Sequence, residues 1–317
     1  MIDLHCDTLS LLEKSGGGLD INGLCVDLEK LEKAGVTAQF FACFADMSRF
    51  TCKSRTQEAF GYVCGLIEYG IKQFHKNSDR IALAESAQDY FKIKREGKIS
   101  AFLTVEEGGI IGEDINKIDF LYSKGVRLIT LCWNHENSIG FPNSANPAEM
   151  DKGLKPFGFE VLEKMNETGI IVDVSHMSDG GFWDVLSKSR APVAASHSNA
   201  RAKCGHPRNL SDGMIKALAE KGGIAGVNFY PYFLNESGNA SLEDISEHIM
   251  YMHKTGGEDF TAIGTDFDGF DGSPFGMENI GQTENLFSDL KKRGLTERQI
   301  EKISHLNAER LMKEVLR

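Results

Sequence analysis

The segment IIVDVSH, residues 170–176, is a short run of apolar, β-branched residues that ends on a histidine. Such a run is typical of a strand buried on both faces, as in a parallel sheet. Seven further runs of this kind occur along the chain, with longer amphipathic stretches between them. We expect strands at residues 1–7, 38–44, 99–106, 127–132, 170–175, 192–196, 223–229 and 260–265.

The stretches between these runs show helical periodicity. They predict helices at roughly 56–76, 115–124, 156–168, 211–221, 241–255, 285–293 and 297–315. Strands that alternate with helices indicate a parallel sheet. Eight such units in 317 residues predict a closed (β/α)8 barrel, the TIM barrel. Because no low-complexity linker or repeat divides the sequence, we expect a single domain over residues 1–317.

The segments that follow the predicted strands are long, and in a (β/α)8 barrel they lie at the C-terminal face, where active sites are built. Among them, residues 133–155 can form either a lid or wall of a substrate site or an ordinary surface loop. The long segments are 45–55, 133–155, 198–210, 230–240 and 266–284.

Composition excludes several classes of partner. The net charge of −11, with no basic stripe, argues against nucleic acid. No run reaches the roughly 18 apolar residues of a membrane span. The N-terminal MIDLHCDTLS lacks the features of a signal peptide. The seven cysteines are scattered and form no CxxC pair, which is typical of a reducing compartment. We therefore expect a cytoplasmic protein without a membrane partner.

Residues of the types that bind metals stand at the ends of five predicted strands. His5 and Asp7 end the first strand and point the same way, because strand side chains alternate between faces. His176 and His197 end two later strands. Buried charges need a partner or a metal. Glu106-Glu107 and Asp266 end the remaining two strands.

These residues are too many for one closed tetrahedral zinc site. They suit two metal ions bridged by a carboxylate and a water, whose pKa the metals lower. Imidazoles and carboxylates without thiolates favour zinc, and manganese or cobalt would fit the same ligands. Asp266 can then accept a proton from that water; alternatively it is a further ligand or a helix cap.

Two other groups of residues have plainer interpretations. His75, His248, His253 and His305 lie in helical patterns and are expected at the surface or in packing contacts. The phenylalanines of the second strand, Phe44 included, are expected in the barrel core.

The order and spacing of these motifs resemble the membrane dipeptidases, also called renal dipeptidases, a metallopeptidase branch of the amidohydrolase superfamily. The resemblance covers nearly the whole chain. The HxD of His5 and Asp7 is a discriminating detail, because most other barrel hydrolases of the superfamily begin with HxH. The matching segments are IDLHCDTL, TVEEGG, GVRLITLCWN, VDVSHMS, SRAPVAASHSNAR, HPRNLSD, GVNFY and IGTDFDG.

The resemblance implies a zinc ion on His5 and Asp7, a second zinc on His176 and His197, and a glutamate that bridges both. Two adjacent glutamates compete for that bridge. The single Glu that family members commonly carry before the Gly pair favours Glu107. The ungapped register back from Gly125 and Thr130-Leu131 favours Glu106, which is the residue we predict.

The resemblance also implies substrate contacts. Arg208 matches the arginine that binds the substrate's C-terminal carboxylate, a role that suits a planar guanidinium. Asp266 matches the family's proton-shuttling aspartate, and Tyr230 is a candidate for lining the pocket. Animal members place a histidine that steadies the oxyanion where this chain has Trp133, so we consider His135 as a substitute.

The predicted function is therefore hydrolysis of dipeptides, L,L and also L,D, by a hydroxide held between two zinc ions. An alternative is an amidohydrolase acting on another small amide, such as an N-acyl amino acid or a lactam. Family members resemble homodimers, and we expect a homodimer here.

Overall fold

Parallel strands form a closed barrel in the computed structural model, which describes residues 1–51 and 54–316. Each strand pairs in parallel with its neighbours, and the strand over Ala38–Phe44 closes the ring on the strand over Ile99–Glu106. The predicted (β/α)8 barrel is confirmed. Its strands are β1 Ile2–Cys6, β2 Ala38–Phe44, β4 Ile99–Glu106, β5 Val126–Thr130, β6 Ile171–Asp173, β7 Ala194–Ala195, β8 Ile224–Val227 and β9 Thr261–Ile263.

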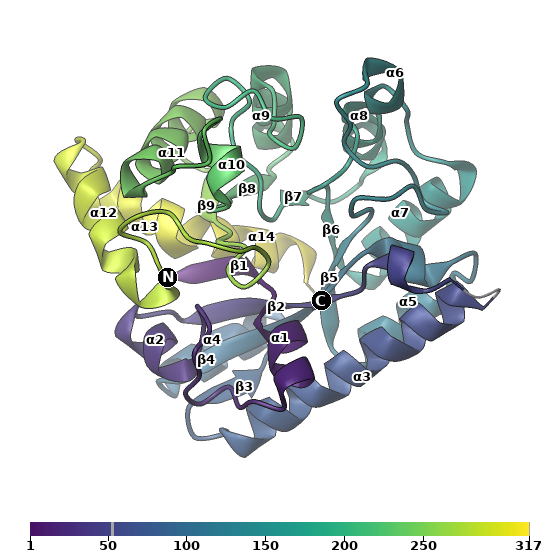
Figure 1. Ribbon diagram of the computed structural model, residues 1–317, viewed down its shortest axis with the longest axis horizontal. Helices are drawn as coiled ribbons and strands as arrows, with labels where there is room; N and C mark the ends of the chain where they lie inside the picture. The colour runs from purple at the N-terminus through teal and green to yellow at the C-terminus, as the bar shows by residue number, and fades with distance from the viewer. Residues whose placement is uncertain (52–53, 317) are drawn as a thin grey trace.

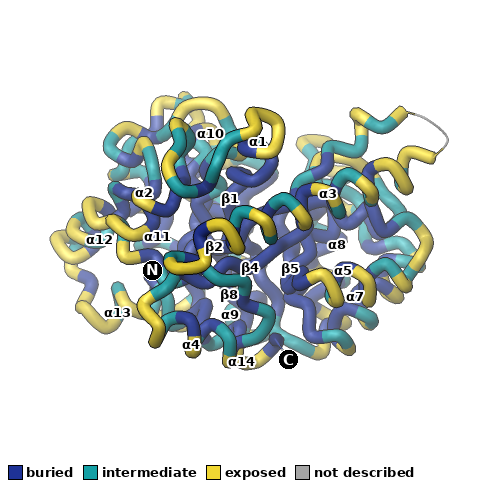
Figure 2. The backbone as a smooth tube through the Cα atoms, turned by 90° about the horizontal axis from the view of Figure 1, so that it is seen from below, coloured by how far each residue is buried: buried dark blue, intermediate teal, exposed yellow. Residues whose placement is uncertain are grey.

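Helices surround the barrel (Figure 1). The buried strands lie at the centre and the exposed residues lie on the outer helices (Figure 2). The helices are α1 Thr8–Ser15, α2 Leu28–Lys33, α3 Arg55–Lys76, α4 Ala87–Arg95, α5 Asn116–Ser123, α6 Pro147–Met150, α7 Pro156–Thr168, α8 Asp179–Lys188, α9 Asp212–Glu220, α10 Pro231–Leu234, α11 Leu242–Gly256, α12 Thr283–Lys292, α13 Glu297–Glu301 and α14 Asn307–Val315.

The predicted helices are all present, but one of them is divided. The pattern over 297–315 predicted a single helix, whereas α13 and α14 are separated by a π-helical turn, η4 Lys302–Leu306. A π turn adds a residue to the helical ladder without breaking its apolar periodicity. The sequence pattern alone therefore does not reveal it.

Several elements were not predicted. A short strand, β3 Ile81–Leu83, pairs with the beginning of β4 outside the ring, and α4 follows it. The helix α8 was also missed, although Ser178 caps it by accepting a hydrogen bond from Gly181 N. A strand of three residues is too short to show a period. The other elements that were not predicted are the short helices α1, α2, α6 and α10 and the 3-10 helices η1 Met47–Arg49, η2 Gly108–Ile111 and η3 Ile280–Gln282.

The apolar core has two parts. The larger cluster lies between the strands and the surrounding helices. The smaller one joins strand residues such as Phe40 and Phe102, whose rings stack at 4.6 Å, to Tyr90 of α4 and Leu311 of α14. One close approach depends on a glycine: a Cβ at Gly70 of α3 would meet side chains of α1 and β4. Burial of this apolar surface holds the strand ends in place around the site.

Among the described helices, none has the length and apolar character needed to cross a bilayer. The described cysteines form no disulfide, and Cys52 lies outside the described residues.

His248 on α11 is a buried packing residue. Its Nδ1 accepts a hydrogen bond from Ala200 N at 3.2 Å, so its Nε2 donates to Leu234 O at 3.0 Å. Burial lowers its pKa from 6.5 to about 4. The folded chain therefore keeps this imidazole neutral where the unfolded chain protonates it.

We expect this histidine to make the protein acid-sensitive. As the pH falls, His248 is protonated in the unfolded chain before it is protonated in the folded chain. The contribution of His248 to the free energy of unfolding is therefore present above pH 6.5 and is lost as the pH falls toward 4. The loss is about 3 kcal/mol. Urea unfolding of the wild type and His248→Gln across this range measures it. A variant that loses as much stability as the wild type between pH 6.5 and 4 would contradict the assignment.

Candidate metal centre

The five metal-binding positions predicted from the sequence come together at the C-terminal ends of the strands. His5 lies in β1 and Asp7 follows it, while Glu106 ends β4. His176 and His197 lie just beyond β6 and β7. All five side chains are buried. In β1 the register relative to β2 slips between Asp3 and Cys6, the irregularity of a β-bulge, which changes where strand-end side chains point.

Glu106 lies between two groups of ligands. Its Oε2 is 3.2 Å from His5 Nε2. Its Oε1 is 3.1 Å from His176 Nε2 and 3.6 Å from His197 Nε2. Each carboxylate oxygen therefore faces a different set of imidazoles, as a bridging ligand requires.

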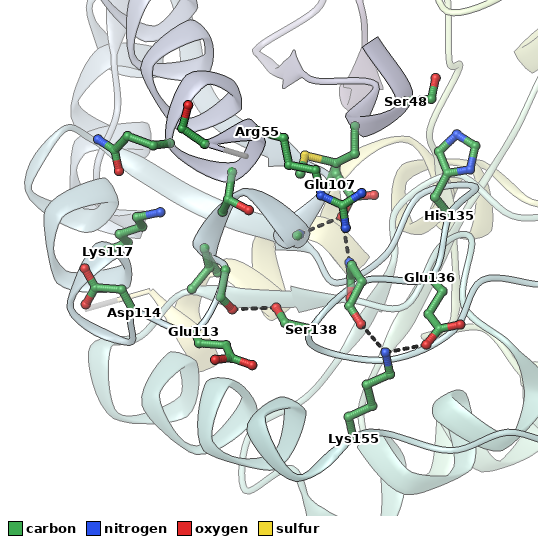
Figure 3. Close-up of a pocket in the computed structure, with 18 residues that line it drawn as sticks. Ser48, Arg55, Glu107, Glu113, Asp114, Lys117, His135, Glu136, Ser138 and Lys155 are labelled. Atoms are coloured by element: carbon green, nitrogen blue, oxygen red, sulfur yellow. Dashed lines mark hydrogen bonds and ion pairs between the residues drawn. The ribbon is translucent and has the colours of Figure 1, made fainter. Parts of the chain in front are cut away.

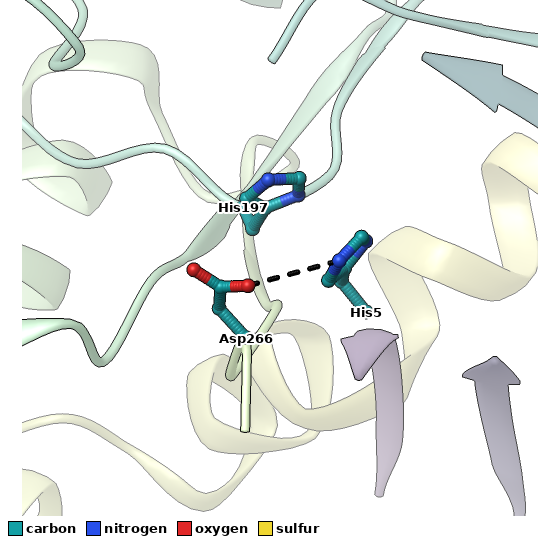
Figure 4. Close-up of side chains that lie close together, drawn as sticks. All are labelled: His5, His197 and Asp266. Atoms are coloured by element: carbon teal, nitrogen blue, oxygen red, sulfur yellow. Dashed lines mark ion pairs between the residues drawn. The ribbon is translucent and has the colours of Figure 1, made fainter. Parts of the chain in front are cut away.

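The His5 side of the cluster holds two further carboxylates. His5 Nε2 is 3.2 Å from Asp7 Oδ2 and 3.7 Å from Asp266 Oδ1. Figure 4 shows the side chains of His5, His197 and Asp266 close together, with the Asp266 carboxylate turned toward His5. The ligand atoms within each of three overlapping groups lie within 4.8 Å of one another: His5, Asp7 and Glu106; Glu106, His176 and His197; His5, His197 and Asp266.

The hydrogen bonding of the cluster fits a bound cation. Asn134 Oδ1, which can only accept, is 3.0 Å from His176 Nδ1, so this nitrogen carries the proton. His176 Nε2 then presents a lone pair to His197 Nε2, 3.0 Å away. Asp7 Oδ1 is buried with no hydrogen-bond partner. Imidazole lone pairs and a buried carboxylate oxygen without a hydrogen-bond partner are what a divalent metal binds.

Burial and neighbouring charges set the protonation of these groups. Burial lowers the pKa of His176 to about 4 and that of His197 well below its usual value. Burial opposes ionisation of Glu106, but the three histidines outweigh it and hold its pKa well below the usual range. Neutral imidazoles and an ionised carboxylate are the forms that bind metals, and His176, His197 and Glu106 are held in these forms. Burial also acts to lower the pKa of His5, but Glu106 and Asp7 outweigh it and raise this pKa well above its usual value.

The side-chain carboxyl groups of Asp7 and Asp266 are harder to ionise. Burial raises the pKa of Asp7 to about 6, and Glu106 adds to the effect. Burial also raises the pKa of Asp266 to about 7; His5 opposes this shift, while Asp7 and Glu106 support it. A nearby cation would lower both values, since it favours the charged form.

The sequence profile of the membrane dipeptidase family, peptidase family M19, matches residues 1–317. The chain belongs to this family. It is 31% identical over 308 residues to the uncharacterized dipeptidase C965.12 of Schizosaccharomyces pombe, covering 92% of this chain and 73% of that protein. The family resemblance inferred from the motifs is thereby confirmed, and the chain is a member of a family of metallo-dipeptidases.

Two further comparisons agree. Dipeptidase tcpJ of Claviceps purpurea is 31% identical over 239 residues, covering 75% of this chain and 56% of that protein. This chain thus matches little more than half of the length of that relative. The solved structure of dipeptidase AC, a metallopeptidase of family M19, shares the fold at a TM-score of 0.91 and 26% identity, covering 99% of this chain and 98% of that one.

The second glutamate that competed for the bridge lies elsewhere. Glu107 turns away from the metal centre of this family member and accepts hydrogen bonds from Gly109 N at 2.6 Å, Trp133 N at 3.0 Å and Asn137 Nδ2 at 2.6 Å. Burial raises its pKa to about 7. Its contacts hold the segment after β5 rather than the cluster.

His135 also lies outside the cluster. It lines a cavity of about 970 Å³ together with Glu107, Arg55 and Lys155 (Figure 3). Its Nε2 is 3.4 Å from Asp46 Oδ1. The structure therefore does not bring His135 to the metal ligands in place of the histidine that Trp133 replaces.

A separate cavity of about 590 Å³ opens onto the ligands. Trp133 and Tyr230 lie on its wall, so the beginning of segment 133–155 forms part of a wall. The lining residues are Asp7, Ser10, Leu11, Lys14, Phe44, Glu106, Trp133, Asn134, His176, Tyr230, Tyr232, Phe233, Asp266, Asp268, Gly269, Phe270 and Asp271.

Arg208 lies behind the cavity wall, with its guanidinium carbon 5.6 Å from the ring centre of Phe233, and only some of its donors have a partner. It is 4% exposed and its Nη1 donates to Ser198 Oγ at 2.8 Å. Its Nε and Nη2 are buried without a hydrogen-bond partner. Burial lowers its pKa to about 10, so it stays charged at neutral pH. Two free donors on a buried guanidinium leave room for one carboxylate.

Backbone conformation is unusual at the rim. Among the described residues, the non-glycine positions with positive φ are Glu107, His176, Asp266 and Asp268. Each follows a barrel strand closely. Such conformations cost roughly 1–3 kcal/mol each and persist where the surroundings enforce them. Here they turn the chain after the strand, so that His176 and Asp266 face the ligand cluster while Glu107 turns away from it.

Three site residues were missed or misassigned. Phe44 was expected in the core but lines the cavity, at the mouth end of β2. Its place on the same strand face as Phe40 could have indicated this. Asn228 follows β8 and donates to Asp266 Oδ2 at 2.8 Å. Asn134, which holds His176, lies in a loop without periodicity, so no sequence signal pointed to it.

Proposed function

We propose that this chain is a dipeptidase that holds two divalent metal ions, zinc in the first place, with manganese or cobalt as possible substitutes. The observation that carries the proposal is the position of Glu106, whose two oxygens face separate groups of ligand atoms. His5 and Asp7 would hold one ion, and His176 and His197 the other. Bound there, the ions would activate a water and polarise the substrate carbonyl.

Asp266 is suited to moving the proton. Asn228 fixes its Oδ2, while Oδ1 faces the cluster 3.7 Å from His5 Nε2. A carboxyl group in this position can accept a proton from the attacking water and return it to the leaving amine. The hydrogen bond from Asn228 orients the group for both steps.

Arg208 supports a substrate with a free C-terminal carboxylate. Its two unpaired donors would bind that carboxylate in a bidentate pair. Tyr230, Phe44 and Trp133 would enclose the rest of a small substrate in the adjoining cavity. We propose dipeptides of L,L and also L,D configuration, as the sequence predicted. A cytoplasmic location and a homodimer remain predictions.

Metal content and turnover together test this function. We expect elemental analysis of the purified chain to give about two zinc ions, and ninhydrin assays to show cleavage of L,L and L,D dipeptides. His176→Ala, which removes one ligand, should lose both an ion and turnover. Two ions without cleavage of any dipeptide would favour an amidohydrolase acting on another small amide, such as an N-acyl amino acid or a lactam. A chain that cannot be loaded with metal would refute the proposal.

A further inference from the structure

Beside the metal centre, β6 and β7 end in a chain of hydrogen bonds that has no part in the roles above. Asp173, the last residue of β6, is fully buried. Its Oδ1 accepts from Ser175 N at 3.0 Å and Ser196 N at 2.8 Å. Its Oδ2 accepts from Thr130 Oγ1 and Ser196 Oγ, both at 2.6 Å. The Ser196 hydroxyl is in turn 2.7 Å from His197 Nδ1.

The number of donors around Asp173 determines which atom carries the hydrogen in each of these hydrogen bonds. An ionised carboxylate offers about four acceptor positions, and Asp173 has donors at four. It therefore has no room for a proton of its own, and the single hydrogen of the Ser196 hydroxyl points to Asp173. The Ser196 oxygen can then only accept, so the proton between Ser196 and His197 belongs to His197 Nδ1.

This fixes the tautomer of His197. With the proton on Nδ1, Nε2 carries a lone pair directed toward Glu106 Oε1 at 3.6 Å and His176 Nε2 at 3.0 Å. We infer that Ser196 and Asp173 are positioning residues of the metal centre, which orient the ring of His197 and direct its Nε2 toward the other ligands. The inference rests on the proposed function, because it concerns binding of the metal that His197 and His176 would share.

The backbone at Ser196, in the middle of this series of hydrogen bonds, is tightly packed. The glycines Gly226 and Gly264 pack against the backbone carbonyl of Ser196, so closely that a Cβ at either position would collide with it. The buried charge of Asp173 is also balanced, since it interacts favourably with Arg208.

The other two imidazoles are held differently. His176 Nδ1 is bound to the neutral amide of Asn134 in a loop. His5 Nδ1 is buried and has no hydrogen-bond partner within the described part of the chain. An imidazole that donates to a hydroxyl group, which itself donates to a carboxylate, is held in one orientation and becomes a more basic ligand. The chain through Ser196 is therefore expected to matter for the ion on the His176–His197 side.

Removal of one hydroxyl tests the inference. We expect Ser196→Ala to weaken binding of one of two Zn²⁺ ions by about 10- to 100-fold, measured by competition with a chromophoric chelator. Ser196→Thr keeps the hydroxyl and should restore most of the affinity. Ser100→Ala, which removes a buried strand hydroxyl with no partner, is the matched control and should leave both affinities unchanged.

A second measurement separates positioning from folding. Long-range ¹H–¹⁵N NMR of the metal-free chain should show His197 protonated at Nδ1 in the wild type and a mixture of tautomers in Ser196→Ala. The thermal midpoint of the metal-free variant should stay close to that of the wild type. Zinc affinity in Ser196→Ala equal to that of Ser100→Ala, or an unchanged tautomer, would overturn the inference. A wild type that binds no zinc would instead refute the proposed function itself.

Discussion

Replacement of Glu106 by Gln is expected to remove at least one metal ion and to lower kcat/KM by about 10³-fold or more. Glutamine has nearly the same shape, but it loses the charge and turns one of the two oxygens into an amide nitrogen that cannot bind a metal. The single oxygen that remains can then bind a metal ion on only one side of the cluster. The cost is several kcal/mol of transition-state stabilisation, and each 1.36 kcal/mol is a factor of ten in rate.

The neighbouring glutamate is the control for this prediction. Glu107→Gln should keep both ions, because Glu107 turns away from the ligand cluster and its oxygens accept hydrogen bonds from Gly109 N, Trp133 N and Asn137 Nδ2; the amide nitrogen costs one or more of these hydrogen bonds but no metal ligand. Zinc content and dipeptide turnover of the two variants, measured side by side, decide between them. Loss of metal from Glu107→Gln with metal retained in Glu106→Gln would reverse the assignment of the bridge.

The ring of strands could be predicted from the sequence because strands that are buried on both faces have an easily recognised pattern. Each barrel strand is a short apolar run, and the residue that ends it is free to be polar. This is why His176 and His197 stood out, whereas the choice of Glu106 over Glu107 came from the family register counted back from Gly125 and Thr130-Leu131. The same reasoning extends to Asn228 and Phe44, which occupy equivalent positions at the ends of β8 and β2.

The parts that escaped prediction depend on contacts between distant segments. Asn134 and His135 are adjacent in one loop, yet Asn134 reaches His176 while His135 turns to Asp46. No local pattern distinguishes two polar residues in a loop. Glu107 holds this loop through Trp133 N, and that contact exists only once β4 and β5 are paired.

The hydrogen bonds through Ser196 could not be predicted from the sequence for a related reason. Ser196 and Asp173 are ordinary residues in VDVSH and AASH, and neither spacing nor type indicates that they meet. The pairing of β6 with β7 brings them together, since Asp173 lies opposite Ala194 in the ladder. Ligands can therefore be predicted from strand ends, whereas the groups that orient them depend on which strands are neighbours.

Arg208→Met is expected to lower kcat/KM for dipeptides by about 10²- to 10³-fold, mainly through a higher KM. The buried guanidinium has two donors without partners, and a substrate carboxylate would take both. Loss of one partner of a buried, hydrogen-bonded charge pair costs roughly 2–5 kcal/mol. Arg208→Lys should recover only part of the loss, because an ammonium group cannot form the planar bidentate pair.

The substrate provides the control for this prediction. A C-terminally amidated dipeptide lacks the carboxylate, so the wild type should cleave it poorly, and Arg208→Met should reduce its turnover little further. Zinc content should be unchanged in the variant, since Arg208 contacts Ser198 rather than a metal ligand. If Arg208→Met slowed the acid and the amide by the same factor, the guanidinium would be acting on the structure of the site. A loss confined to the free acid would instead assign to Arg208 the selection of a free C-terminus, the feature that separates a dipeptidase from a general amidase.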